Sequence, residues 1–432
     1  MRVLLVSENR CRENLVPYPL GVACVAAATR QAGHEVACLD LMFSEHPVAD
    51  VLRAIDDFRP DCIGLSIRNI DNQDMYAGEF YLPPVREIVN AVKEATAAPV
   101  ILGGAGFTIF PRECLDYLDL EMGIVGEGER TFVELLSFLE ARLPPYDLPG
   151  LAVRREGKSG INPPAPHAWP GLSPPPDRNF FDVARYNWTP GTGSPFVANL
   201  QARRGCHMHC IYCTNPGIEG RLVRARPPRE VADELASLEN DHGLRYAIFT
   251  DSLFNYPPPY AEELCREIAS RDLSIRWWCN LNPLYCERKL LKLLREAGCV
   301  GMSIGNESGS EDILASLKKG FTREHVVRAV CDAHKLGFRT NCFLLLGGPG
   351  ENESTVRESV ELMEELAPTQ VTVTVGIRVY PGCEIRELAL REGMIEAGQN
   401  LLFPAFYLSR EVEDWLYPYM RELCDIHPGW VL

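Results

Sequence analysis

Short apolar runs alternate with segments of helical spacing along most of the chain. In the first third, the apolar runs lie at residues 3–6, 35–39, 62–67, 100–102 and 122–125. Between them, apolar residues recur every three or four positions, as in 20–31 and 85–95. Continuous apolar strands separated by helices are typical of a parallel sheet covered on both faces. Residues 1–142 are therefore predicted to form an open, doubly wound (Rossmann-like) α/β domain.

A second alternation of strands and helices begins at residue 196. Its apolar runs lie at residues 196–201, 246–250, 275–279, 300–304, 340–346 and 370–375. Helical spacing fills the gaps, for example at 229–238 and 323–336. These strand–helix units are too few for the eight of a closed barrel, so residues 196–382 are predicted to form a partial (β/α)6 barrel. Residues 383–432 are predicted to be a small helical region that covers its open edge.

A proline-rich segment separates the two alternations. Residues 144–195 hold twelve of the 33 prolines of the chain. Proline lacks an N–H donor and has a fixed φ angle, so no regular helix or sheet is expected there. Residues 143–195 are predicted to be an ordered linker between the two domains.

Composition narrows the class of protein. The 432 residues carry 43 basic and 59 acidic side chains, a net charge of −16, and 46% are hydrophobic. These values fit a globular protein rather than a disordered one, and they argue against nucleic acid or an anionic membrane as the main partner. No run approaches the roughly 18 apolar residues of a membrane span. A cytoplasmic location is expected.

Three of the sixteen cysteines form a motif. Most of the others stand singly in apolar segments, where a reduced cysteine behaves as a small hydrophobe, and no disulfide framework is expected. Cys206, Cys210 and Cys213 follow the first barrel strand with C-x3-C-x2-C spacing. Three thiolates fit a 4Fe–4S cluster whose fourth iron stays open. The alternative is a zinc site, which would need a fourth ligand that His207 or His209 could supply.

This motif, placed after the first strand of a partial barrel, resembles that of the radical S-adenosylmethionine (SAM) superfamily. The resemblance implies that the open iron binds SAM and that the reduced cluster cleaves it to a 5′-deoxyadenosyl radical. Tyr212, before the third cysteine, resembles the residue beside the adenine. Asp251 departs from the Gly-Gly-Glu form usual at its position. The residues that the resemblance assigns to SAM are Tyr212, Asp251, Asn280, Glu307, Ser308, Gly347, Gly348 and Arg378.

The first domain resembles the cobalamin (B12)-binding domain of the class B-like radical SAM methyltransferases. Ligands of open α/β sheets lie outside the carboxyl ends of the strands, where this chain is rich in glycine. A nucleotide site, a flavin site or a purely structural domain are the alternatives. The Asp-x-His-x-x-Gly run that supplies a cobalt ligand in many cobalamin proteins is absent, and Arg68, Met75 and Tyr76 are candidates to cover the lower corrin face. The residues assigned to cobalamin are Leu20, Gly21, Ser66, Ile67, Arg68, Met75, Tyr76, Gly103, Gly104, Gly106, Gly126 and Glu127.

The resemblance implies a cobalamin-dependent radical SAM methyltransferase that methylates an unactivated carbon of a small, natural-product-like molecule. A second hypothesis keeps both cofactors but transfers no methyl group, as in ring contraction, cyclisation, epimerisation or oxidation. A third, an iron–sulfur electron carrier, is disfavoured because such carriers usually fill every iron site with cysteine. An electron donor such as flavodoxin or ferredoxin is the expected protein partner. We expect neither a nucleic-acid partner nor a membrane span.

Overall fold

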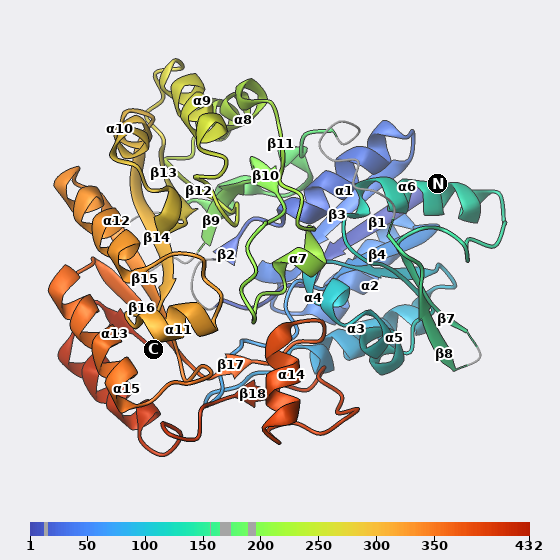
Figure 1. The fold of residues 1–432 in the computed structure, drawn as a ribbon. Coiled ribbons are helices and arrows are strands. Elements are labelled where there is room, and N and C mark those ends of the chain that lie inside the picture. Colours follow the sequence, from blue (N-terminus) through green and yellow to red (C-terminus); the bar gives the residue numbers. More distant parts are fainter. Residues whose placement is uncertain (13–15, 156, 165–173, 189–195) are drawn as a thin grey trace. The chain divides into compact units, whose positions relative to one another are not determined.

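The structure is a computed structural model that describes residues 1–12, 16–155, 157–164, 174–188 and 196–432 (Figure 1). Internal contacts divide the chain into two units. The first unit comprises residues 1–72, 78–186 and 217–219. The second comprises residues 73–77, 187–216 and 220–432. Each unit is built on its own mainly parallel sheet.

The sheet of the first unit has the order β3-β1-β4-β5-β6-β7-β8. Neighbouring strands from β3 to β6 are parallel, and the apolar residues of β1 and β4 are almost completely buried. Both neighbours of β1 follow it in the chain, so the sheet has a switch point beside β1. The strands are β1 (Arg2–Ser7), β3 (Glu35–Asp40), β4 (Cys62–Ser66), β5 (Val100–Gly103), β6 (Met122–Ile124), β7 (Leu151–Arg155) and β8 (Lys158–Ile161). A short strand, β2 (Val16–Pro17), is not part of this sheet.

Helices contact one another in two groups, α1 with α6 and α2 with α3 and then α5, as expected for a doubly wound sheet. Their apolar positions recur at helical spacing, which buries one stripe of each helix. The helices are α1 (Leu20–Gln31), α2 (Pro47–Phe58), α3 (Leu82–Ala95), α4 (Ala105–Ile109), α5 (Pro111–Leu118) and α6 (Gly128–Glu140). Short 3-10 turns occur at η1 (Leu41–Phe43), η2 (Arg178–Phe180) and η3 (Val183–Tyr186).

The proline-rich segment contains regular structure, so the expectation of none was wrong. Strands β7 and β8 pair as an antiparallel hairpin, and β7 pairs antiparallel with β6 at the edge of the first sheet. The two strands, at residues 151–155 and 158–161, contain no proline, so their ladder donors are intact. Residues 165–173 and 189–195 of the predicted linker lie outside the described residues.

In the second unit, parallel strands follow the order β19-β16-β15-β14-β13-β12-β9. The strands predicted from the apolar runs are present, with ends shifted by at most three residues. Buried and half-buried positions alternate along β15 and β16, so one face of these strands is covered and the other is partly accessible. The strands are β9 (Phe196–Leu200), β12 (Tyr246–Phe249), β13 (Arg276–Leu281), β14 (Cys299–Glu307), β15 (Arg339–Leu346), β16 (Gln370–Val375) and β19 (Trp430–Val431).

Helices α8, α9, α10, α12 and α13 lie along the outside of these strands (Figure 1). This is the partial barrel that the sequence predicts. Two short antiparallel pairs are added to it, β10 (Arg203–Arg204) with β11 (Arg224–Ala225), and β17 (Ile377–Arg378) with β18 (Phe406–Tyr407). The helical elements are α7 (Asn215–Ile218), α8 (Pro228–Asn240), α9 (Pro258–Ala269), η4 (Pro283–Tyr285), α10 (Arg288–Glu296), α11 (Glu311–Ser316), α12 (Arg323–Lys335), α13 (Glu353–Leu366), α14 (Glu384–Arg391) and α15 (Leu416–Ile426).

The C-terminal region is less helical than predicted. It contains α14 and α15, but β18 and β19 also belong to it, and β19 pairs in parallel with β16 at the edge of the barrel sheet. A strand ladder therefore extends the edge that helices alone were expected to cover. Within the described ranges, no helix is both long and apolar enough to cross a membrane.

Candidate functional site

The three-cysteine loop follows β9 and β10 in the second unit. Cys206 is buried, and Cys210 and Cys213 are half-buried. The turn requires glycine at position 205, where φ is +92° and a Cβ atom would collide with the Leu222 carbonyl oxygen. The pKa of Cys213 is raised to about 11, mainly by burial. Repulsion from the Cys210 and Cys206 thiolates also raises it. The Cys213 thiol is therefore protonated at neutral pH and has the other two sulfurs as neighbours.

A donor set of three neighbouring thiols on one loop fits an iron–sulfur cluster, whose binding would displace their protons. Among the described residues, no three His, Cys, Asp or Glu side chains already converge on a metal position. Of the alternative zinc ligand His207 only Nε2 is engaged, while Nδ1 is buried without a partner among the described residues. Its Nε2 lies 2.9 Å from the Tyr285 hydroxyl, and its ring stacks on Tyr256.

A buried polar triad lies beside this loop. The Tyr212 hydroxyl donates to Glu307 Oε1 at 3.0 Å, and Lys319 Nζ donates to both, at 2.8 Å to the hydroxyl and 3.0 Å to Oε1. Burial by itself would lower the pKa of Lys319, but attraction from Glu307 and from the Cys210 thiolate outweighs it and raises that pKa. Lys319 is thus a buried cation close to the cysteines. The sequence predicted Tyr212 in the cysteine loop and Glu307 at a strand end, where the structure has them, but not Lys319, which follows α11 in a Lys-Lys-Gly turn.

Asp251, at the end of β12, is occupied by the protein itself. Its carboxylate accepts from the Ala202 N–H at 3.1 Å and from Arg203 Nε at 3.3 Å. Both side chains of this ion pair are at most 2% exposed. Burial raises the pKa of Asp251 despite the attraction of Arg203. The pair fixes the chain just before the cysteine loop, and the predicted contact of Asp251 with SAM remains a prediction.

The other residues assigned to SAM also lie at strand ends, where most of their polar groups have partners. The Asn280 amide lies 3.4 Å from the Asp251 carbonyl oxygen. Ser308 shares a hydrogen bond with Ser359 at 3.0 Å. The Gly347 and Gly348 N–H groups donate to the buried Glu351 carboxylate at 2.5 and 3.0 Å. The Arg378 guanidinium donates to the carbonyl groups of Val379 and Leu401 at 2.7 and 2.8 Å. These contacts hold the strand-end loops in shape.

The residues assigned to cobalamin gather at the carboxyl edge of the first sheet, with two exceptions. Ser66, Ile67 and Arg68 end β4, the glycines at 103, 104 and 106 follow β5, Gly126 and Glu127 follow β6, and Leu20 and Gly21 begin α1. A Cβ atom at Gly104, where φ is +94°, would collide with the Ile67 carbonyl oxygen. At Gly21 and Gly103, by contrast, a Cβ atom would meet no other atom within 4 Å. Glycine backbone that faces open space, with no side chain in the way, allows a flat ligand such as a corrin ring to approach closely.

Met75 and Tyr76 are the exceptions, because their contacts lie in the second unit. The Tyr76 ring stacks on Tyr417, with centroids 3.7 Å apart and planes 14° apart. The sulfur of Met75 lies against Gly376, at the end of β16. Large apolar side chains in a loop find partners on a neighbouring surface more readily than they stay solvated. Their predicted role under the corrin ring stays a prediction.

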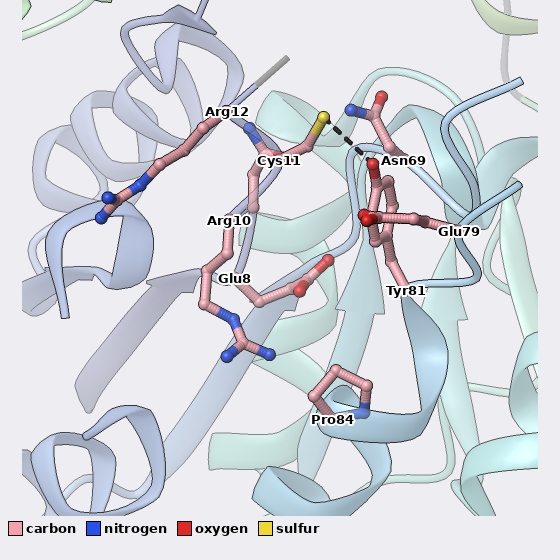
Figure 2. Close-up of a pocket in the computed structure, with 9 residues that line it drawn as sticks. Glu8, Arg10, Cys11, Arg12, Asn69, Glu79, Tyr81 and Pro84 are labelled. Carbon is pink, nitrogen blue, oxygen red and sulfur yellow. Dashed lines mark hydrogen bonds between the residues drawn. The ribbon is translucent and has the colours of Figure 1, made fainter. Parts of the chain in front are cut away.

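A pocket of about 490 Å³ lies at the switch point of the first sheet, at the carboxyl end of β1 (Figure 2). Charged side chains crowd it, and Glu8 points into it although that residue is only 3% exposed. None of these residues was assigned by the sequence reasoning, although the charged run directly after the buried strand β1 was a usable signal. The lining residues are Glu8, Asn9, Arg10, Cys11, Arg12, Asn69, Glu79, Tyr81 and Pro84.

The fold and these sites define a class of proteins in which an open α/β domain precedes a partial barrel that carries a three-cysteine loop. Comparison with known proteins makes the assignment more specific. Residues 201–363 match the model of the radical SAM superfamily, and residues 14–136 match that of the B12 binding domain. The chain thus combines a B12-binding domain with a radical SAM domain, which confirms the expected family and its fold.

Individual proteins with similar sequence or structure agree. Tryptophan 2-C-methyltransferase from Streptomyces laurentii is 29% identical over 88% of this chain and 73% of its own length. Anaerobic magnesium-protoporphyrin IX monomethyl ester cyclase from Rubrivivax gelatinosus is 24% identical over 81% of this chain and 62% of its own length. The solved structure of the radical SAM methyltransferase TsrM from Kitasatospora setae, with cobalamin and a [4Fe-4S] cluster bound, has a TM-score of 0.84, 23% identity, and coverage of 100% of this chain and 90% of that one. The expected cofactors agree with these matches.

Proposed function

We propose that this protein is a cobalamin-dependent radical SAM methyltransferase acting on a small organic molecule. The observation that carries the proposal is the loop of Cys206, Cys210 and Cys213 beside the barrel strands, in a chain that also has a B12-binding domain. When bound, the cluster would supply the electron that cleaves SAM, and cobalamin would carry the methyl group. The methyltransferase among the similar sequences supports this choice.

The residues of the second unit have roles in this proposal. Cys206, Cys210 and Cys213 hold three irons and leave the fourth open. The Lys319 ammonium is placed to attract a carboxylate near the cysteine loop, while Glu307 and Tyr212 keep that ammonium oriented. Residues such as Ser308 and Gly348 keep the neighbouring strand ends in place for the remainder of SAM. Because most of these groups are already paired, this side of the site needs little rearrangement on binding.

The residues of the first unit provide the cobalamin site. The open backbone at Gly21 and Gly103 lets a large flat ring approach the strand ends. Arg68, at the end of β4, has an exposed side chain with no hydrogen-bond or ion-pair partner in the described part of the chain. We assign it to the lower corrin face. Leaving that face without a histidine ligand would favour reduction of the cobalt.

Product analysis tests the proposal. The full-length protein is reconstituted anaerobically with iron, sulfide and hydroxocobalamin, then given SAM, a reductant and candidate substrates. Methyl transfer from methylcobalamin predicts S-adenosylhomocysteine and a methylated product, and radical initiation adds 5′-deoxyadenosine. Formation of 5′-deoxyadenosine and a product without S-adenosylhomocysteine would contradict the methyltransferase assignment.

The non-methylating alternative has one supporting observation, the similarity to a tetrapyrrole ester cyclase. It predicts a cyclised or oxidised product of unchanged carbon count in the same assay. Either reaction requires electrons from outside, so a flavodoxin- or ferredoxin-like donor is part of the proposal. All sixteen cysteines lie within the described residues and are free thiols, which suits a reducing, cytoplasmic environment.

A further inference from the structure

The pocket at the end of β1 occupies the position where open α/β sheets bind ligands. The strand β1 has β3 on one side and β4 on the other, and the loops after β1 and β4 both contribute to the pocket. Such a switch point creates a crevice at the carboxyl edge. Any ligand of the first domain that reaches this crevice would meet the side chains drawn in Figure 2.

Glu8 is the unusual member of the pocket. It directly follows β1, and its backbone N–H donates to the Ser66 carbonyl group at 3.4 Å, which fixes its position beside β4. Its side chain is 97% buried, yet its carboxyl group has no hydrogen-bond partner among the described residues. Figure 2 shows this group directed into the space between Arg10, Tyr81 and Pro84. Its oxygens are not among the fully buried unpartnered atoms of the described residues, so they open onto the pocket. A ligand there would supply the hydrogen-bond partner that the protein does not.

The protonation state of Glu8 limits what it can bind. Burial raises the pKa of Glu8 to about 8, with Arg10 acting weakly in the opposite direction. Apart from Arg10, the titratable group that faces Glu8 from another element is Cys114 of α5, whose thiol burial keeps protonated. The pocket also contains Cys11, Arg12, Glu79 and Tyr81. At neutral pH Glu8 is mainly a neutral acid, which offers one O–H donor and one carbonyl acceptor.

Arg10 supplies a second open hydrogen-bonding position. Its Nε–H is buried and has no partner within the described ranges. The nearby Tyr81 hydroxyl, in contrast, already donates to Cys11 Sγ at 3.3 Å. The open groups on residues 8–10 thus include the Glu8 acid, with one donor and one acceptor, and the N–H groups of Arg10. A primary amide matches this set, because its oxygen accepts two hydrogen bonds and its NH2 group donates. Primary amides are the groups that line the rim of the corrin ring in cobalamin.

We infer that Glu8, as a neutral acid, and Arg10 bind a peripheral primary amide of the corrin ring and so contribute directly to cobalamin affinity. This inference rests on the proposed function, since it takes cobalamin as the ligand of the first domain. It makes Glu8 a cofactor-binding residue that acts without carrying charge. A phosphate would be poorly matched by an acid, and a cationic ligand would favour the carboxylate form.

The test measures the affinity of the full-length apoprotein for hydroxocobalamin at pH 7, by absorbance titration. Glu8→Leu removes both hydrogen-bonding atoms at similar size and should weaken binding about tenfold or more. Glu8→Gln keeps a donor and an acceptor and should bind within about threefold of the wild type. Glu87→Gln and Glu87→Leu change an exposed carboxylate of α3 outside the pocket lining and serve as matched controls that should bind normally.

The stability of the apoprotein and the pH dependence of hydroxocobalamin affinity distinguish a binding role of Glu8 from a purely structural one. Apo Glu8→Leu should be at least as stable as the wild type, because an unpaired buried polar group is removed. Wild-type affinity should fall between pH 7 and pH 9 relative to Glu8→Gln, since the acid form is lost. Normal binding by Glu8→Leu, an affinity that rises with pH, or loss of binding together with loss of apo stability would each overturn the inference. Failure of the wild type to bind hydroxocobalamin would instead contradict the proposed function.

Discussion

The carboxyl edges of the two sheets differ in how their charged side chains are paired. In the second unit, Asp251 pairs with Arg203, and the Glu351 carboxylate accepts two backbone N–H groups. Lys319 and Glu307 are joined there as well. In the first unit, the Glu8 carboxyl group points into the pocket, and the Arg10 Nε–H is buried without a partner among the described residues. At the barrel edge the amide of Asn306 and Oε1 of Glu351 also lack partners among the described residues. The contrast therefore concerns the ion pairs: the barrel edge has formed its own before anything binds, whereas Glu8 and Arg10 leave groups open for a ligand.

The largest effect is expected at the cysteine loop. Cys210→Ala removes one of three thiolates, and a cluster held by two thiolates should be lost during anaerobic reconstitution. We expect nearly all cluster absorbance, iron and SAM cleavage to disappear while hydroxocobalamin still binds. Cys424→Ala, which removes a half-buried thiol on α15, is the matched control and should behave as the wild type. Equal iron content in both variants would contradict the assignment of the loop.

The polar triad should show the next largest effect. Lys319→Met leaves Glu307 without its cation at a position where both side chains are at most 14% exposed. Breaking such a pair should lower the free energy of unfolding by about 3 kcal/mol and weaken SAM binding strongly. Lys319→Arg keeps the charge and should recover much of both losses. Urea unfolding and equilibrium dialysis with SAM measure the two effects, and unchanged SAM affinity in Lys319→Met would remove that residue from the proposed site.

Glu8 should make the apoprotein less stable as the pH rises. Its pKa is raised from 4.5 to about 8 in the folded state, so between these values the folded state holds a proton that the unfolded state has released. Stability therefore falls with rising pH across this window, by up to roughly 4 kcal/mol. Urea unfolding at pH 5 and pH 9 measures the fall, which Glu8→Gln should reduce. Parallel pH profiles for the two proteins would show that Glu8 titrates normally.

The smallest effect is expected at Tyr76. This ring is 41% exposed but stacks on Tyr417. Tyr76→Leu and Tyr417→Leu should each cost about 1 kcal/mol, and a double-mutant cycle should give a coupling of a similar size. If Tyr76→Leu instead leaves stability unchanged and alters the spectrum of bound cobalamin, then Tyr76 covers the corrin ring as the sequence suggested and its stack on Tyr417 contributes little.

The sequence predicted the features that depend on local pattern. Buried parallel strands such as β1 and β14 stand out because they are apolar and bounded by turns, and the cysteine spacing identified its loop directly. Features that depend on distant partners were not accessible. The pairing of β7 with β6, the packing of Tyr76 on Tyr417 and the contact of Lys319 with Tyr212 join segments far apart in the chain. Glu8 was missed because its burial, rather than its identity, makes it unusual.

The central claim is that one chain holds both an iron–sulfur cluster with an open iron and a cobalamin. Metal and cofactor analysis of the anaerobically reconstituted full-length protein, combined with electron paramagnetic resonance, tests it most directly. We predict about four irons, four sulfides and one cobalamin per chain, and a reduced-cluster signal that changes when SAM is added. A protein that binds no cluster, or a cluster whose signal ignores SAM, would contradict the account.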